Sequence, residues 1–232
     1  MKSYGQYCPV ARASELLAER WTLLLVRNLL AGCRTFGELR AGAPGIPKAL
    51  LSSRLESLTR ARVVTRRPRA SGHGWEYELT DKGRALESVC RALGEWGAEW
   101  LETEPHHLDP AYAVWATARL VDLRKVPPPG VTIRLELAQG STTRRFWMLL
   151  FEPRAEVCST SMGRDVDLVM ATDAETLADY NLRRTTLAAA MRAGRLRLSG
   201  PRELVRSLPS WIDPSPYAYT ERQKGPRTDA VR

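Results

Sequence analysis

Between Pro9 and Trp100 the hydrophobic pattern of the sequence changes its period twice. Up to residue 61 the apolar residues recur every three or four positions, which indicates amphipathic helices. Residues 63–79 then hold two short segments, one of them strictly alternating, around a Ser-Gly-His-Gly turn, and these predict a β-hairpin. Helical spacing returns after Thr80. This order of elements predicts a winged helix-turn-helix.

The boundaries of two consecutive helices can be placed from the residues that begin and end helices. Thr35 is suited to the N-cap of a short helix that runs to Arg40, and the stretch 41–45 (Ala-Gly-Ala-Pro-Gly) is a turn. The next helix is expected over 47–61, because Pro47 is suited to a first turn and leucines recur on one face. The polar side chains of this second helix are left on its outer faces.

Basic residues are concentrated around that second helix. The 232-residue chain has a formal net charge of +9. Residues 34–69 contain nine Arg or Lys and two acids, a net charge of +7. A helix that fits the major groove, followed by a basic hairpin, can reach base edges and phosphates together, and short Ser side chains permit a close approach. We expect Arg54 to read bases and Arg66, Arg67 and Arg69 to contact phosphates. The full set expected at double-stranded DNA is Thr35, Pro47, Lys48, Ser52, Ser53, Arg54, Ser57, Arg66, Arg67, Arg69 and His73, the last of which fits a turn residue better than a base reader.

The helix expected over 81–102 carries an aromatic stripe that one chain has little left to bury. Its apolar residues are spaced alternately by three and four positions and end in two tryptophans. Two such helices could bury each other. We therefore expect a homodimer held partly by Leu93, Trp96 and Trp100.

A second domain is expected over 111–212, after the linker 104–110. Five short strands are predicted between residues 131 and 199, interleaved with helical segments, while residues 213–232 have the composition of a disordered tail. With the first domain over 1–103, the fold class is α+β in two domains.

Several classes of protein are disfavoured by what the sequence lacks. Its four cysteines form no CxxC pair and His106 and His107 have no ligands at suitable spacing, so we expect neither a disulfide framework nor a metal site. No Gly-rich phosphate loop, G-x-S-x-G or HExxH motif supports an enzyme, and no cofactor is expected. Without a long apolar segment, we expect a cytoplasmic protein that has no membrane partner.

Residues 7–102 resemble the HxlR family of winged-helix regulators. The resemblance is carried by YCPVARASELLAERWTLLLVRNLL, TFGELR, GIPKALLSSRLESL and YELTDKGRAL. It implies dimers on operators with twofold symmetry, the helix 47–61 in the major groove and the hairpin 65–77 on the DNA backbone. The sequence departs from the family at Pro47, where Ser or Thr is usual, and at Arg62, where Gly is usual. The latter places a larger residue in a tight turn or adds a phosphate contact.

Residues 111–208 resemble the sterol-carrier-protein fold, most clearly in MRAGRLRLSG. The resemblance implies a five-stranded sheet with helices that cover one face and enclose an apolar tunnel. A small apolar or aromatic effector is the expected ligand, although each candidate residue taken singly is more often a core residue. The candidates for its pocket are Trp147, Leu149, Phe151, Met170, Tyr180, Leu187 and Met191.

These observations predict a transcriptional regulator, with repression as the expected mode, whose DNA binding responds to a ligand in the second domain. One alternative is a switch through Cys8, since some HxlR-like regulators sense oxidants or electrophiles at that position and Arg12 could favour a thiolate. An inert, half-buried Cys8 is the plainer interpretation. A purely structural second domain is a further alternative.

Overall fold

The computed structural model describes residues 3–70 and 73–217 of the chain. The chain divides into two compact units, Met1–Leu93 and Gly94–Arg232. Residues 71 and 72 of the predicted hairpin turn lie outside the described residues, as do residues 218–232 of the predicted tail.

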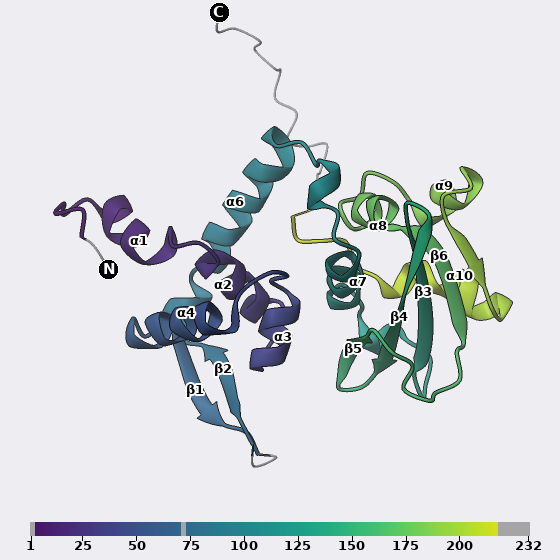
Figure 1. Ribbon diagram of the computed structural model, residues 1–232, viewed down its shortest axis with the longest axis horizontal. Helices are drawn as coiled ribbons and strands as arrows, with labels where there is room; N and C mark the ends of the chain where they lie inside the picture. Colours follow the sequence, from purple (N-terminus) through teal and green to yellow (C-terminus); the bar gives the residue numbers. More distant parts are fainter. Residues whose placement is uncertain (1–2, 71–72, 218–232) are drawn as a thin grey trace, which may run out of the picture. The chain divides into compact units, whose positions relative to one another are not determined.

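The first unit is a winged helix-turn-helix, as its sequence predicts (Figure 1). Helices come first, the two-stranded hairpin follows, and the chain then returns to helix. The elements are α1 (Pro9–Leu17), α2 (Thr22–Leu30), α3 (Phe36–Ala41), α4 (Lys48–Arg60), β1 (Val64–Pro68), β2 (Trp75–Leu79), α5 (Asp81–Arg84) and α6 (Glu87–Trp100), which continues past Leu93 into the second unit.

Local sequence explains where α3 and α4 begin. Thr35 and Glu38 form a capping box at the start of α3, in which each side chain bonds to the other residue's backbone N–H. Pro47 is the N-cap of α4, and the helix then buries Leu51, Leu55 and Leu58 on one face. These leucines lie three or four positions apart, so burying them fixes which residues of α4 face outward.

The turn after α4 adopts the conformation that the sequence suggested would be tight. Arg62 has a φ of 57°, in the left-handed region where residues other than glycine are uncommon. The Thr80 hydroxyl donates to the Arg62 carbonyl over 2.7 Å. This bond joins the turn to the residue that follows β2, at the base of the hairpin.

The helix predicted over 81–102 is divided in the structure. Thr80 caps the single turn α5, and α6 begins three residues after α5 ends. The Leu86 N–H bonds to the carbonyl of Gly83, three residues back, and the Arg84 guanidinium donates to the Leu79 carbonyl over 2.6 Å. The hydrogen bond between residues three positions apart closes a tighter turn than that of an α-helix, and this turn interrupts the regular helix.

The second unit contains the predicted five-stranded sheet, in the order β5-β4-β3-β6-β7. The pair β3 and β6 is parallel and the other neighbours are antiparallel. Its elements are η1 (Pro105–His107), α7 (Pro110–Arg119), η2 (Leu123–Lys125), β3 (Val131–Gln139), β4 (Thr142–Phe151), β5 (Arg154–Cys158), β6 (Leu168–Asp173), α8 (Ala174–Asn181), α9 (Leu187–Arg192), β7 (Arg197–Ser199) and α10 (Arg202–Trp211).

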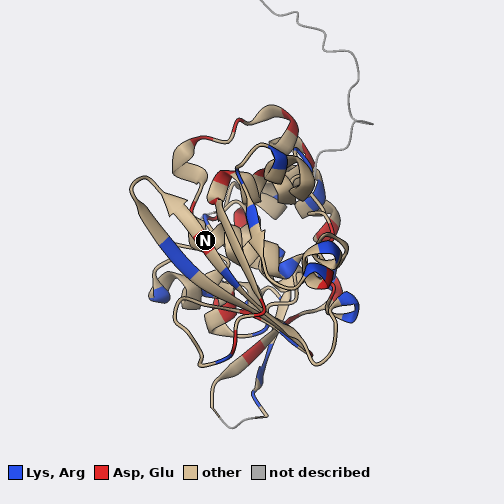
Figure 2. Cartoon of the chain, turned by 90° about the vertical axis from the view of Figure 1, so that its right-hand side faces the viewer, with Lys and Arg blue, Asp and Glu red and all other residues tan. Residues whose placement is uncertain are grey.

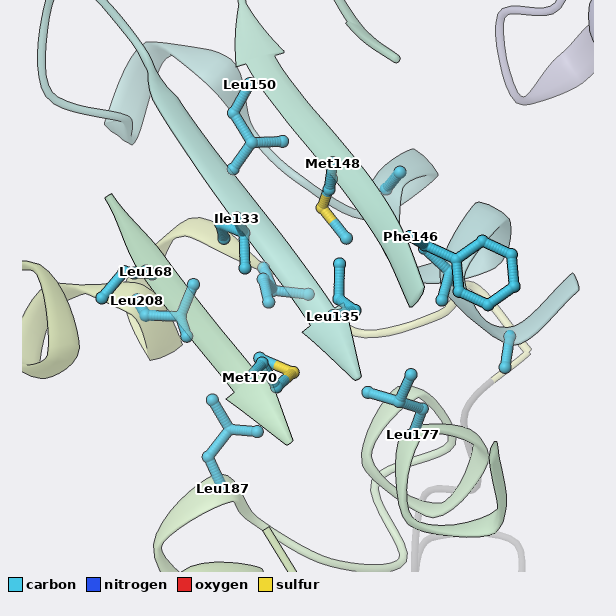
Figure 3. Packing of buried hydrophobic residues seen from close by; sticks show 14 of the residues in the cluster. Ile133, Leu135, Phe146, Met148, Leu150, Leu168, Met170, Leu177, Leu187 and Leu208 are labelled. Carbon is cyan, nitrogen blue, oxygen red and sulfur yellow. The ribbon is translucent and has the colours of Figure 1, made fainter. Parts of the chain in front are cut away.

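One face of this sheet forms the core of the second unit together with the helices (Figure 3). Alternate residues of the central strands point to the same side, where side chains of α7, α8, α9 and α10 pack on them. The labelled members of the core are Ile133, Leu135, Phe146, Met148, Leu150, Leu168, Met170, Leu177, Leu187 and Leu208. Among the described residues, no helix is both long enough and apolar enough to cross a membrane.

Candidate nucleic-acid interface

The exposed face of α4 carries four of the residues predicted to meet DNA. Pro47, Lys48, Ser52 and Ser53 are all exposed, while the leucines on the other side of the helix are buried. Apart from Lys48 these side chains are small. A duplex could therefore approach the α4 backbone closely at this face, with hydroxyl groups able to donate to or accept from base edges.

Two other predicted residues are already engaged within the protein. The Thr35 hydroxyl is half-buried and accepts the Glu38 N–H, because it caps α3. Ser57 is half-buried, and its hydroxyl accepts from the Arg60 guanidinium over 3.3 Å. Both residues support the helices more directly than they face outward.

Arg54 lies away from the exposed face of α4. Its Nε donates to the Arg20 carbonyl over 3.1 Å, and its Nη2 pairs with the Glu19 carboxylate. Only 17% of the Arg54 side chain is exposed. In this conformation the guanidinium is directed at the junction between α1 and α2.

The hairpin presents the predicted basic residues on its first strand. Arg66 and Arg67 are exposed on β1, and the acidic side chains of β2 lie on the facing strand, as can be followed in the hairpin that ends in the grey tip of Figure 2. The Arg66 guanidinium lies over the Trp75 ring, 4.0 Å from its centroid, and Arg67 pairs with Glu78. A planar cation stacked on an aromatic ring keeps its N–H edges available to phosphate oxygens.

The remaining hairpin candidates lie nearer the tip. Arg69 is half-buried, and its backbone N–H bonds to the Gly74 carbonyl, so it closes the described end of the hairpin. His73 is exposed beside residues outside the described part of the chain. The structure thus places a helix face and a basic strand in one unit.

A polar pair on α2 that the sequence reasoning missed holds the motif together. Asn28 is fully buried, and its amide donates to the Leu39 carbonyl at the end of α3. Arg27 donates to the Asn28 side chain and to the Gly42 carbonyl over 2.7 Å. These bonds satisfy carbonyls at the C-terminal end of α3 and so fix the turn before α4. A single Asn within an apolar helix was the available signal.

Cys8 lies at the start of α1, and the cation expected to favour its thiolate is paired with a carboxylate. Cys8 is half-buried at the N-cap of α1, and the neighbouring Arg12 guanidinium pairs with Glu15 over 3.1 Å.

Burial raises the pKa of the Cys90 thiol, and burial followed by the charge of Glu156 raises the pKa of the Cys158 thiol. Cys90 and Cys158 therefore stay protonated at neutral pH.

The apolar stripe of α6 is exposed within this single chain. The exposed fractions of Leu93, Trp96 and Trp100 are 50%, 55% and 62%. Helix α1, which the sequence reasoning did not assign to any interface, also buries none of its residues, and Val10 on it is 72% exposed. Both helices thus present apolar side chains to solvent.

The seven residues predicted for a ligand lie on both faces of the sheet in the second unit. Met170 and Leu187 belong to the core on the helix-covered face, Tyr180 is half-buried against that core, and Met191 is exposed. On β4 the side chains alternate, so the opposite face carries the other three residues, Trp147, Leu149 and Phe151. One small ligand could not contact both sets without passing through the sheet.

A cavity in the second unit has a different lining. Its volume is about 360 Å³. It is lined by Leu101, Glu102, Thr103, Leu108, Glu175, Ala178, Asp179 and Arg184. Arg184 donates to Thr103 over 3.3 Å, and Arg195 lies 3.6 Å from the Asp179 carboxylate. None of the seven predicted residues lines this polar cavity.

Comparison with known proteins identifies relatives of this chain. Residues 16–105 match the family described as HxlR-like helix-turn-helix. The HTH-type transcriptional regulator Rv3095 of Mycobacterium tuberculosis is 36% identical over 145 residues, which are 56% of this chain and 91% of that protein. The HTH-type transcriptional regulator YvaP of Bacillus subtilis is 36% identical over 108 residues, 45% of this chain and 97% of that protein.

A sterol carrier protein is among the solved structures to which the chain is similar. Sterol carrier protein 2 like 2 of Aedes aegypti is 19% identical, covers 42% of this chain and 89% of that chain, and has a TM-score of 0.34. The fold of the second unit is described by its own strand order and one-sided core.

Helix α4 packs on the first unit through its buried leucines, exposes small side chains on its outer face and is followed by a basic hairpin. Together with the family match, this arrangement defines a transcriptional regulator with a helix-turn-helix DNA-binding domain. The chain belongs to the HxlR-like helix-turn-helix family.

Proposed function

We propose that this protein binds a twofold-symmetric DNA operator as a homodimer and represses transcription from it. The observation that carries the DNA-binding step is the outer face of α4, where Lys48, Ser52 and Ser53 are exposed above a row of buried leucines. A helix so anchored presents a defined set of donors to the major groove. Arg66 and Arg67 on β1 supply phosphate contacts, which set the register of the helix on the duplex.

The experiment is selection of bound sequences from random DNA, followed by affinity measurement on the selected operator. Replacing Lys48 and Ser52 with Ala should relax the base preference at defined positions and cost roughly 1–3 kcal/mol of binding per base-reading contact. Arg192→Ala, which removes an exposed charge from the second unit, is the matched control and should leave the operator affinity unchanged. Binding without any sequence preference would contradict the proposal.

Dimer formation is supported by the exposed apolar side chains of α6 and by Val10 on α1. On α6 both tryptophans are more than half exposed, and α1 buries none of its residues. Exposed apolar area on this scale is typical of an interface that a second copy covers. Twofold symmetry of the protein would then match twofold symmetry of the operator. Repression follows if the operator overlaps a promoter, and a reporter assay with and without the protein tests that sign.

We further propose that the second unit binds a small apolar effector which lowers the affinity for DNA. The helix-covered face supports this location, because Tyr180 packs against a core that contains Met170 and Leu187. An effector that prefers the conformation unable to bind DNA reduces operator affinity roughly 5- to 150-fold for a typical coupling. Met and aromatic side chains adapt readily to such ligands.

Candidate apolar compounds should be titrated into operator-binding and thermal-unfolding assays. A true ligand raises the unfolding temperature because it binds the folded state. A chain that ends near Glu104 is the ligand-blind control. If full-length and truncated proteins respond alike to every compound, the second unit is structural, and Cys8 becomes the switch to test with oxidants and a Cys8→Ser variant.

A further inference from the structure

The recognition helix α4 is bonded to the junction of α1 and α2 through a single side chain. Arg54 reaches from the middle of α4 to the Arg20 carbonyl and the Glu19 carboxylate, 34 and 35 positions away in the sequence. The junction itself has an unusual backbone, since Trp21 has a φ of 79° and is the N-cap of α2. The Arg20 guanidinium lies 5.1 Å from the centre of the Trp21 ring.

The position of α1 is otherwise weakly determined within the chain. None of its residues is fully buried, Val10 is 72% exposed, and Leu16 and Leu17 are only half-buried. Arg54 on α4 bonds to both Glu19 and Arg20 of the adjoining junction.

We infer that Arg54 is a positioning residue, which fixes the angle of α4 against the α1–α2 junction instead of reading bases. The inference rests on the proposed operator binding and assigns Arg54 a role opposite to the one its place on a basic helix suggests. Its donors satisfy a backbone carbonyl and a carboxylate, so a duplex would have to displace both bonds to use them. It follows that a displacement of α1 changes operator affinity through Glu19 and Arg54.

Three roles for Arg54 give different results in DNA binding. A base reader would lose discrimination at one operator position when removed, and a phosphate contact would lower the slope of log Kd against log salt by about one. A positioning residue changes neither quantity, but weakens binding to the operator as a whole. Glu19 separates the cases further, because loss of a carboxylate near DNA should tighten binding unless that carboxylate holds the helix in place.

The decisive variants are Arg54→Gln, Glu19→Gln, both together, and the exchanged pair Arg54→Glu with Glu19→Arg. We expect each single variant to weaken operator binding roughly 10-fold, and the double Gln variant to be no weaker than either single one, as for two partners in one interaction. The exchanged pair should recover part of the affinity. Glu56→Gln removes an exposed carboxylate from α4 itself and should tighten binding.

The inference is overturned if Glu19→Gln tightens binding as Glu56→Gln does, or if Arg54→Gln changes base preference or the salt slope. A measurement without DNA separates it from the proposed function. Hydrogen exchange of the α4 amides should be faster in both single variants than in the wild type. In the double Gln variant it should be no faster than in either single variant. If exchange in the single variants equals that of the wild type, the inference is overturned even if the protein binds operators. If exchange is faster in the single variants and the two effects are not additive, the inference is sustained even if the wild-type protein binds no operator. Unfolding midpoints show whether each variant is folded.

Discussion

The amide of Asn181 at the end of α8 donates to the Thr117 hydroxyl on α7 over 3.0 Å, inside the core of the second unit. The Thr117 hydroxyl in turn donates to the Ala113 backbone carbonyl over 2.9 Å. The backbone carbonyl of Asn181 accepts the Ser215 N–H. Both side chains are buried. The polar Asn181 thus links α8 to α7 through a buried hydrogen bond.

This pair predicts a non-additive effect on stability. Thr117→Val leaves the Asn181 amide buried without its partner, and we expect a loss of about 1–3 kcal/mol in the free energy of unfolding. Adding Asn181→Leu removes the unsatisfied group, so the double variant should be less destabilised than the sum of the singles. Urea denaturation of the four proteins measures this, and additive losses would mean that the pair does not interact.

We predict that Trp96→Ala combined with Trp100→Ala dissociates the protein. Each tryptophan is more than half exposed in one chain, and burying an aromatic side chain stabilises an interface by about 1.5–3 kcal/mol. Analytical ultracentrifugation at micromolar concentration should show a monomer. Trp75→Ala, which removes an exposed aromatic residue from the hairpin, should remain a dimer. A dimeric double variant would exclude α6 as the main interface.

We predict that Arg66 acts on the DNA backbone through its charge, with Trp75 as its support. Arg66→Ala should weaken binding to all sequences alike and lower the salt slope by about one. Trp75→Ala removes the ring 4.0 Å from the guanidinium but keeps the charge, so affinity should fall less and the slope should stay the same. Affinities at several salt concentrations test both. An altered base preference in Arg66→Ala would instead make this residue a base reader.

The pH dependence of stability should contain a contribution from Asp122. A hydrogen bond from the Arg124 side chain lowers the pKa of Asp122 from 3.8 to about 2. Because the pKa is lower in the folded state, the ionised carboxylate stabilises the fold above about pH 4, and this contribution is lost as pH falls from 4 to 2. Asp122→Asn should therefore lower stability at neutral pH and flatten the acid side of the profile.

Denaturation at a series of pH values from 2 to 6 measures the Asp122 effect. Asp81→Asn is the control, since it removes a carboxylate that is 99% exposed in its pair with Arg84. Fully exposed pairs contribute little. Parallel pH profiles for wild type and Asp122→Asn would contradict the prediction.

The first unit could be predicted well because its signals are local. The leucines of α4 and the cap at Thr35 each depend on residues a few positions apart, and both are confirmed. The role expected of Arg54 depended on partners more than thirty positions away, which no periodicity reveals. Likewise, the break between α5 and α6 arises from bonds made back to the hairpin and the preceding turn.

In the second unit the strands were predictable, whereas the faces of β4 were not. The segment 146–151 is continuously apolar, so it lacks the alternation that distinguishes a core face from an outer one. The structure places Met148 in the core and Trp147 on the other side. The residues predicted to bind a ligand were chosen for their apolar and aromatic chemistry alone, and they therefore lie on both sides of the sheet.

The hairpin of the first unit is held at one end only within its described residues. At its base Val64 and Tyr77 are buried, and the Tyr77 N–H bonds to the Arg34 carbonyl outside the hairpin, whereas Arg66, Arg67 and Pro68 farther along β1 are exposed. Substitutions toward the tip thus remove few contacts from the rest of the protein. In evolution, the outer positions can change while the base stays constant, so the number of charges that the hairpin offers to the proposed phosphate contacts can vary at little cost to folding.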